Sequence, residues 1–311
     1  MGTYFSEADM KRSERKKEKM KAKNTSQNAV HSGINKRTKE PVKTLIFRRS
    51  MFYAICLFVV YQLMLIPLQI LNYPVFWVAA VIGFFLVIAE LLYSRISETH
   101  TKIHVALPHM RQLRWREHTF HHLIIPGLLY VSGVLFLFFN RVRTLDQVAI
   151  VLLSGTFFVI LYNVSATYLK MYQVTRHSRM LFDFVNIIVF YFVVDVLINL
   201  MLYYGISQML VFAGAALVTF VLIGMMIIVT RQSSLEIVMM LLLTSLLMGA
   251  IVFALWHVPL FSIAVISIVA TVAFYLFDAY WHHQLEGIFS WDAMSQYVLF
   301  AVMAIILLLY I

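Results

Sequence analysis

The sequence predicts an all-α integral membrane protein, a helix bundle with about nine transmembrane helices. Apolar runs of about 20 residues follow one another from residue 44 to the end of the chain, separated by brief polar breaks. In addition, 61% of the 311 residues are hydrophobic, whereas a soluble domain is about half apolar. Because lipid cannot satisfy backbone hydrogen bonds, runs of this length must be helical.

The apolar runs give the expected spans directly. We expect them at residues 46–70, 73–95, 121–140, 147–170, 181–204, 207–230, 233–255, 258–281 and 291–311. Several connections, such as residues 71–74 and 204–207, are short, so consecutive helices should be antiparallel neighbours.

The first 43 residues have a different composition and form a separate region. Residues 1–49 hold 14 Lys and Arg against 5 acidic residues. Residues 1–43 lack the apolar surface that would offset their ordering entropy, which predicts a disordered basic tail before a transmembrane domain at 44–311. Membrane lipids are the expected partners, with anionic headgroups attracting the tail. No nucleic-acid partner is expected, and the oligomeric state stays open.

Charge also predicts the orientation. With the N-terminus in the cytoplasm, 23 Lys and Arg fall on the inner side, and only Arg141 and Arg143 fall outside. The positive-inside rule therefore places the N-terminus in the cytoplasm and the C-terminus outside. The expected location is a bacterial cytoplasmic membrane.

Histidines form two groups on the predicted cytoplasmic side. In the first, His100 and His104 share one helix face, and His118, His121 and His122 share another. The second group, His282 and His283, follows six spans later, so the chain has returned to the same side. Imidazoles grouped in this way can converge on a metal. Two other interpretations stay open, namely histidines at the headgroup level and a pH-sensitive cluster.

The spacing His100-x3-His104 followed by His118-x2-His121-His122 resembles the first two histidine boxes of membrane fatty-acid desaturases and lipid hydroxylases. The pair His282-His283 is similar to the third box, although Ala279 stands where that box has His or Gln. The resemblance implies a diiron centre that activates O₂ to oxidise a lipid, with iron as cofactor. The implied ligands are His100, His104, His118, His121, His122, His282 and His283.

A broader resemblance covers more of the chain. The segment from Leu113 to Pro126 and the ending with His282, Gly287 and Tyr297 look similar to uncharacterised polytopic proteins of small-genome bacteria. This resemblance implies no activity and no catalytic residue.

Ionisable residues inside predicted spans are further candidates, because a charge in lipid is costly and usually functional. Asp195 lies near the middle of the fifth span, while Asp278 and Glu90 lie closer to span ends. We expect Asp195 to be paired within the bundle or to serve transport. Asn186 and Asn199 should hydrogen-bond neighbouring helices.

These observations leave the activity undetermined. The chain has no P-loop and no G-x-G-x-x-G motif, and its single Cys56 gives no disulfide framework. The sequence therefore predicts a multi-pass membrane protein without a complete catalytic motif, and whether it is an enzyme stays open. The alternatives are a diiron lipid desaturase or hydroxylase and a transporter or proton-coupled carrier that uses Asp195.

Overall fold

The computed structural model describes most of the chain after residue 43. The described residues are 44–45, 47–100, 124–140, 142–168, 176–230, 234–258, 262–286 and 291–310. The bundle described below belongs to the compact unit Ser50–Ile311. The predicted tail at residues 1–43 lies outside the described residues.

Within the described residues every regular element is a helix, as the sequence predicts. The helices are Phe47–Gln69, α2 (Tyr73–His100), α4 (Ile125–Phe139), α5 (Arg143–Tyr168), α6 (Arg176–Tyr204), α7 (Gln208–Thr230), α8 (Leu235–Trp256), α9 (Ile263–Glu286) and α10 (Trp291–Tyr310). Six of these nine helices contain a stretch long and apolar enough to cross a membrane, and α4, α7 and α10 contain shorter apolar stretches. The polytopic all-α class is therefore confirmed, while nine membrane crossings stay a prediction.

Two tight turns explain why consecutive helices run antiparallel. At the end of helix Phe47–Gln69, Leu71 is left-handed with φ of 56°. There the Asn72 N–H donates to the Pro67 carbonyl and the Leu71 N–H donates to the Leu68 carbonyl, a Schellman arrangement. At the end of α6, Gly205 has φ of 65° and donates to Met201, which closes the simpler left-handed cap.

Some helix ends differ from the sequence prediction for local reasons. Helix α5 begins four residues early, at Arg143, where Asn140 Nδ2 donates to Asp146 Oδ1 over 2.8 Å and holds the turn. Helix α9 continues past residue 281 to Glu286. His282 and His283 therefore lie inside its last turns, with fixed helical spacing from the residues before them.

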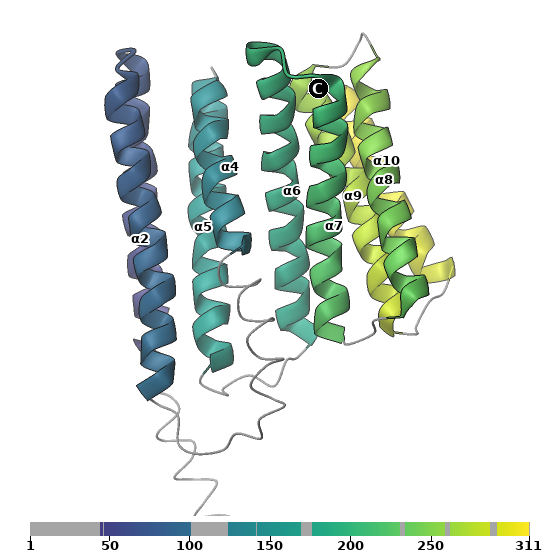
Figure 1. Ribbon diagram of the computed structural model, residues 1–311, viewed down its shortest axis with the longest axis horizontal. Coiled ribbons are helices and arrows are strands. Elements are labelled where there is room, and N and C mark those ends of the chain that lie inside the picture. Colours follow the sequence, from purple (N-terminus) through teal and green to yellow (C-terminus); the bar gives the residue numbers. More distant parts are fainter. Residues whose placement is uncertain are drawn as a thin grey trace, which may run out of the picture. The chain divides into compact units, whose positions relative to one another are not determined.

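Helix α6 is the centre of the bundle. It packs against α4 and α5 on one side and against α7 and α9 on the other. Figure 1 shows α6 between these two groups, with α8 and α10 beyond α7 and α9. Of an 18-residue window in its apolar stretch Asp183–Tyr204, 72% is buried inside the bundle, a larger share than in any other candidate span among the described residues.

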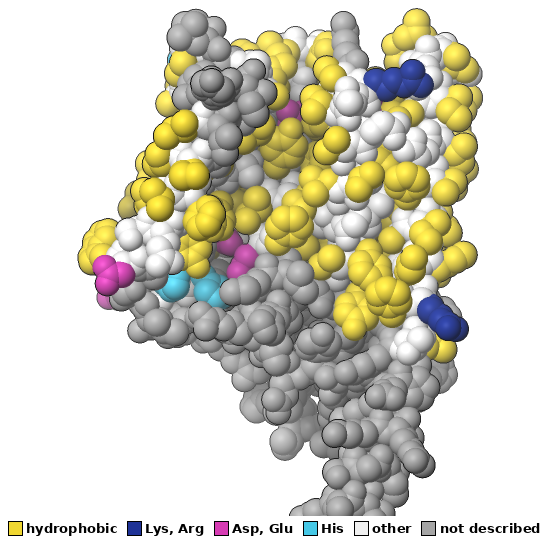
Figure 2. Space-filling view, turned by 180° about the vertical axis from the view of Figure 1, so that it is seen from behind, with side chains coloured by type: hydrophobic (Ala, Val, Ile, Leu, Met, Phe, Trp, Pro, Cys, Tyr) yellow, Lys and Arg dark blue, Asp and Glu magenta, His cyan; other side chains and the backbone are white. Residues whose placement is uncertain are grey.

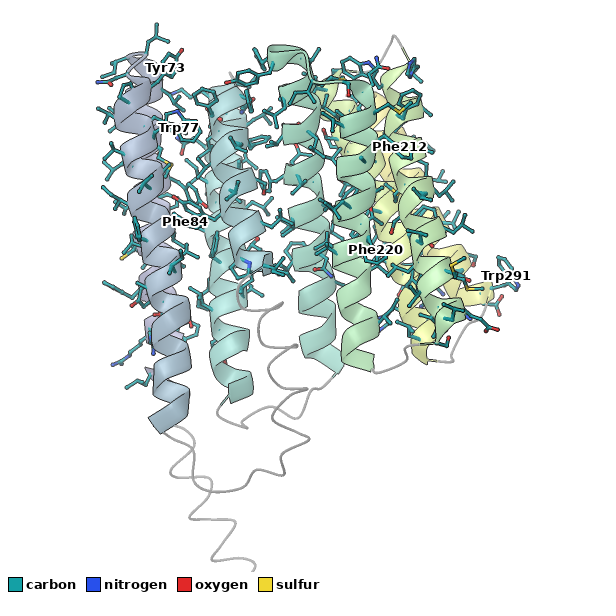
Figure 3. All side chains as sticks on the ribbon, viewed as in Figure 1. Tyr73, Trp77, Phe84, Phe212, Phe220 and Trp291 are labelled. Carbon is teal, nitrogen blue, oxygen red and sulfur yellow. The ribbon has the colours of Figure 1, made fainter. Side chains whose placement is uncertain are left out.

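Aromatic contacts join α2 to α4. Trp77 points from α2 toward α4 (Figure 3), and its ring centroid lies 5.3 Å from that of Phe138. Deeper in the bundle the Tyr130 hydroxyl donates to the Ala80 carbonyl over 2.7 Å. That close approach uses the space beside Gly83, where any Cβ would meet the Tyr130 hydroxyl.

The outer faces of the helices are strongly apolar. Exposed large hydrophobic side chains run along α2, α8 and α10, and Figure 2 shows them over much of one face. An apolar surface of this extent would favour aggregation in water, but in lipid it is the expected exterior. Together with the candidate spans, it identifies the chain as a multi-pass helical membrane protein.

A substitution at Gly249 tests how closely α7 and α8 pack. A Cβ at Gly249 would lie 2.7 Å from the Phe212 carbonyl oxygen, so a Gly249→Ala variant must push the two backbones apart. We expect it to lose about 1–3 kcal/mol of stability, measured by thermal unfolding in detergent. Gly155→Ala in α5 is the control, since nothing lies within 4 Å of its Cβ. Equal melting temperatures for the two variants would contradict this close packing.

Candidate functional site

Helices α6 and α9 carry six of the buried polar side chains among the described residues, namely Asn186, Asp195, Asn199, Ser267, Thr271 and Asp278. Three cross-helix pairs set the register of the two helices, namely Asp195 with Ser267, Phe190 with Phe274, and Asp183 with His282. Residue numbers rise along α6 as they fall along α9, so the helices are antiparallel. We call the two ends of the bundle the Asp183 end and the Trp256 end, after residues near each.

Asp195 is hydrogen-bonded inside the bundle. Ser267 of α9 donates to Asp195 Oδ1 over 3.2 Å, and Asn199, one turn along α6, donates to Asp195 Oδ2 over 2.8 Å. All three side chains are buried. Asn199 therefore bonds within its own helix, where the sequence analysis expected a neighbouring helix. The arrangement makes Asp195 a link between α6 and α9.

Next to this link, toward the Asp183 end, lies an aromatic stack. The rings of Phe190 and Phe274 are nearly parallel, at 7°, with centroids 4.3 Å apart. Neither ring is exposed to solvent. The stack fills the α6–α9 interface with apolar volume, so it separates the Asp195 link from the polar residues beyond it.

Asp278 and Asn186 lie one turn beyond the stack. Asp278 follows Phe274 by four residues on α9, and Asn186 precedes Phe190 by four on α6, which places both about 6 Å from the stack along the helix axes. Both are buried, at 2% and 7% exposure. One oxygen of each side chain, Oδ1, has no hydrogen-bond partner among the described residues. A buried carboxylate oxygen in this state is costly, and such groups in native proteins usually meet a water or an ion.

Five partly exposed side chains lie near the level of Asp278 on α6, α9 and α10. Asp183 acts electrostatically on Asp278, and its Oδ2 atom lies 3.9 Å from Nδ1 of His282. On the α10 side, the Tyr297 ring lies 5.5 Å from the His283 ring and 5.6 Å from the Tyr275 ring, between centroids. We call these residues the Asp278 cluster: Asp183, Tyr275, Asp278, His282, His283 and Tyr297.

The cluster joins three helices at the Asp183 end. Histidine and acidic side chains gather there on the face shown in Figure 2, beside hydrophobic side chains. The members other than Asp278 are neither buried nor fully exposed. Chemically, the arrangement offers one buried carboxylate, with a second carboxylate and two imidazoles at the same end of the bundle.

Most of the predicted metal ligands lie outside the described residues. This applies to His104, His118, His121 and His122, while His100 ends α2 with a side chain that is not described. Only His282 and His283 can be placed. Among the described residues, no group of three or more His, Cys, Asp or Glu is arranged to hold a metal ion. The diiron interpretation therefore rests on the sequence motif alone.

The last ionisable candidate, Glu90, and the small cavity in the bundle both lie away from the Asp278 cluster. Glu90 is buried in α2, away from the α6–α9 interface. A small cavity of about 10 Å³ lies near the Trp256 end, lined by residues of α6, α7 and α8 that include Ile198, Val252 and Trp256. It holds at most about one water, and Asp195 is not in its lining. It is too small to admit a substrate.

Sequence reasoning missed the aromatic part of the cluster. Tyr275, Asp278 and His282 follow the helical spacing i, i+3 and i+7, a signal that was visible in the sequence. Tyr297 carries no such signal, because its place depends on how α10 packs against α9. Ser267, the partner of Asp195, resembles any other small residue in an apolar span.

Comparisons with known proteins add no assignment. No family model, curated protein or solved structure matches the chain.

Ser267 tests the link between α6 and α9. We expect Ser267→Ala to lower the free energy of unfolding by about 0.5–1.5 kcal/mol, because Asp195 Oδ1 loses its donor. Unfolding in mixed detergent micelles measures the change. The control is Ser295→Ala in α10, an exposed serine whose hydroxyl bonds only within its own helix and whose removal should cost less than about 0.5 kcal/mol. If Ser267→Ala costs no more than the control, Asp195 is not a structural link.

Proposed function

We propose that this protein is a membrane carrier that binds a cation at Asp278. The observation that carries the proposal is the buried carboxylate with an oxygen that no described residue bonds. Ionisable residues are rare within membrane spans, and those that occur often mark ion and substrate pathways. A bound cation would supply the missing partner and offset the repulsion between Asp278 and Asp183.

Asp195 has a different role in this proposal. It lies deeper in the bundle, beyond the Phe190–Phe274 stack, and Ser267 and Asn199 both donate to it. A buried carboxylate with two donors favours structural pairing over binding a transported ion. We therefore assign the binding role to Asp278 and the structural role to Asp195.

The position of Asp278 suits entry from one side. It lies about two turns inside the end of the candidate span Ile263–Leu285, within reach of the partly exposed residues at the Asp183 end. The proposal includes the predicted topology of nine spans in a bacterial cytoplasmic membrane. With the N-terminus inside, the Asp183 end faces the cytoplasm, and a cation would enter the site from there.

Transport is tested with the purified full chain in liposomes. Currents on a solid-supported membrane are recorded after concentration jumps of protons, sodium and tetramethylammonium. We expect at least one of these cations to give a current, and Asp278→Asn should reduce it about tenfold or more, since a contact to a charged group contributes roughly 1.5–3 kcal/mol.

Asp292→Asn is the matched control for this experiment. It makes the same chemical change at an exposed carboxylate in the first turn of α10 and should leave the current unchanged. Asp195→Asn separates the two roles. It should lower the melting temperature, whereas the current per folded protein should stay close to that of the wild type. If liposomes with the wild-type protein give no current with any of these cations, the proposal is wrong.

The topology is tested by labelling single cysteines. In a Cys56→Ser background, Ser207→Cys marks the connection between α6 and α7, and Asp292→Cys marks the start of α10. We expect a membrane-impermeant maleimide to label Ser207→Cys in intact cells and Asp292→Cys only after permeabilisation. The reverse pattern would place the Asp183 end outside.

A further inference from the structure

We infer that the cation bound at Asp278 is a proton, and that the protonated carboxyl group donates a hydrogen bond to the amide oxygen of Asn186 on the facing helix. This inference rests on the proposed function and specifies its substrate. It depends on three features of the α6–α9 interface, which are the register of the two helices, two buried oxygens without a partner, and the charges of the surrounding side chains.

The register places Asn186 and Asp278 at the same level of the interface. Each helix contributes a stripe of three residues there, namely Asp183, Asn186 and Phe190 on α6, and Phe274, Asp278 and His282 on α9. Spacings of three and four residues place each stripe on one face of its helix. The outer members meet across the interface, with ring centroids 4.3 Å apart at one end and a carboxylate oxygen 3.9 Å from an imidazole nitrogen at the other. The middle members, Asn186 and Asp278, therefore lie between these two contacts.

Both middle residues are buried, and each has an oxygen without a partner. Asp278 is 2% exposed and Asn186 is 7% exposed, and Oδ1 of each has no hydrogen-bond partner among the described residues. A carboxylate oxygen and an amide oxygen are both acceptors, so these two atoms cannot bond to each other while Asp278 is ionised. A proton on the carboxyl group makes it a donor, and one O–H···O bond then satisfies both residues.

The helices around Asp278 supply no permanent positive charge. Helices α6, α7, α8 and α10 pack against α9, and the described side chains of all five include no lysine or arginine. Helix α7 also has no titratable side chain, and α8 has only Glu236 in its first turn. The titratable groups near the level of Asp278 are Asp183 on α6, Tyr275, His282 and His283 on α9, and Tyr297 on α10. The nearest carboxylate has the same charge as Asp278, so a balancing cation must come from outside these helices.

A proton fits these surroundings better than a metal ion does. Calcium and magnesium take six or more oxygen ligands, and transition metals take several His, Cys or carboxylate ligands in fixed geometry. Among the described residues, no three His, Cys, Asp or Glu side chains are arranged to hold a metal ion. A proton needs only the carboxyl group and one acceptor, and it removes the buried charge.

Exchanging the two residues tests the pair. Asp278→Asn removes the acid, whereas Asn186→Asp combined with Asp278→Asn places the acid on α6 and the amide on α9. Protonation is followed in the full chain in nanodiscs by infrared difference spectroscopy, as the carbonyl stretch of a buried carboxylic acid that appears when the pH is lowered. We expect this band in the wild type and in the exchanged variant, and we expect Asp278→Asn alone to lose it.

A single substitution tests the hydrogen bond if the exchanged variant fails to fold. Asn186→Leu keeps a side chain of similar size but removes the acceptor, so the acid band should remain and move to higher frequency. Asp292→Asn is the control, because it removes an exposed carboxylate and should leave the band of the buried acid unchanged. A band at the wild-type frequency in Asn186→Leu, or a folded exchanged variant without the band, would contradict the bond to Asn186.

The outcomes also separate this inference from the proposed function. If no acid band depends on Asp278, or if added sodium removes the band at constant pH, the proton assignment is wrong. Sodium currents that depend on Asp278 would then leave the carrier proposal standing. If the band depends on Asp278 but no cation jump gives a current, the acid–amide pair stands and the carrier proposal is wrong.

Discussion

The structure depends on how α6 satisfies its polar groups in the middle of the bundle. In lipid, an unbonded carboxylate or amide has no water to replace a missing partner. Asp195 meets this constraint through one hydroxyl of α9 and one amide of its own helix. Because Ser267 must lie opposite Asp195, the register of α9 on α6 is fixed. The same register brings Phe190 onto Phe274 and places Asp278 level with Asn186.

One interface therefore contains polar groups in two different states. On one side of the aromatic stack, every oxygen of the Asp195 carboxylate has a donor, and the contribution is to stability. On the other side, Asp278 is as deeply buried but has an oxygen without a described partner. Such a group costs stability unless a partner meets it, and the cation binding that we propose would offset that cost. The contrast between two aspartates on facing helices is the reason that we propose a structural role for one and a binding role for the other.

The helical class and most helix positions follow from the sequence because lipid leaves a long apolar run no other conformation. Helix ends are less predictable, since they depend on single contacts such as that of Asn140 with Asp146. Asp195 and Asp278 were visible candidates because charges are rare in apolar spans. Their partners were not visible, because Ser267 and Tyr297 are identified only by the packing of α9 against α6 and α10. Apolar spans carry little information about which helices touch.

The three helices of the Asp278 cluster are held to different degrees. The α6–α9 pair is fixed by the Asp195 link and by the Phe190–Phe274 stack, so Asp183 and Asp278 keep their relation. Helix α10 packs mainly on α9 and presents much of its surface outward, and Trp291 at its start projects away from the bundle in Figure 3. The contacts described for Tyr297 are ring contacts to His283 and Tyr275 on α9. In the carrier that we propose, α10 would be the helix that moves against a fixed α6–α9 pair, which is the kind of rearrangement that alternating access needs.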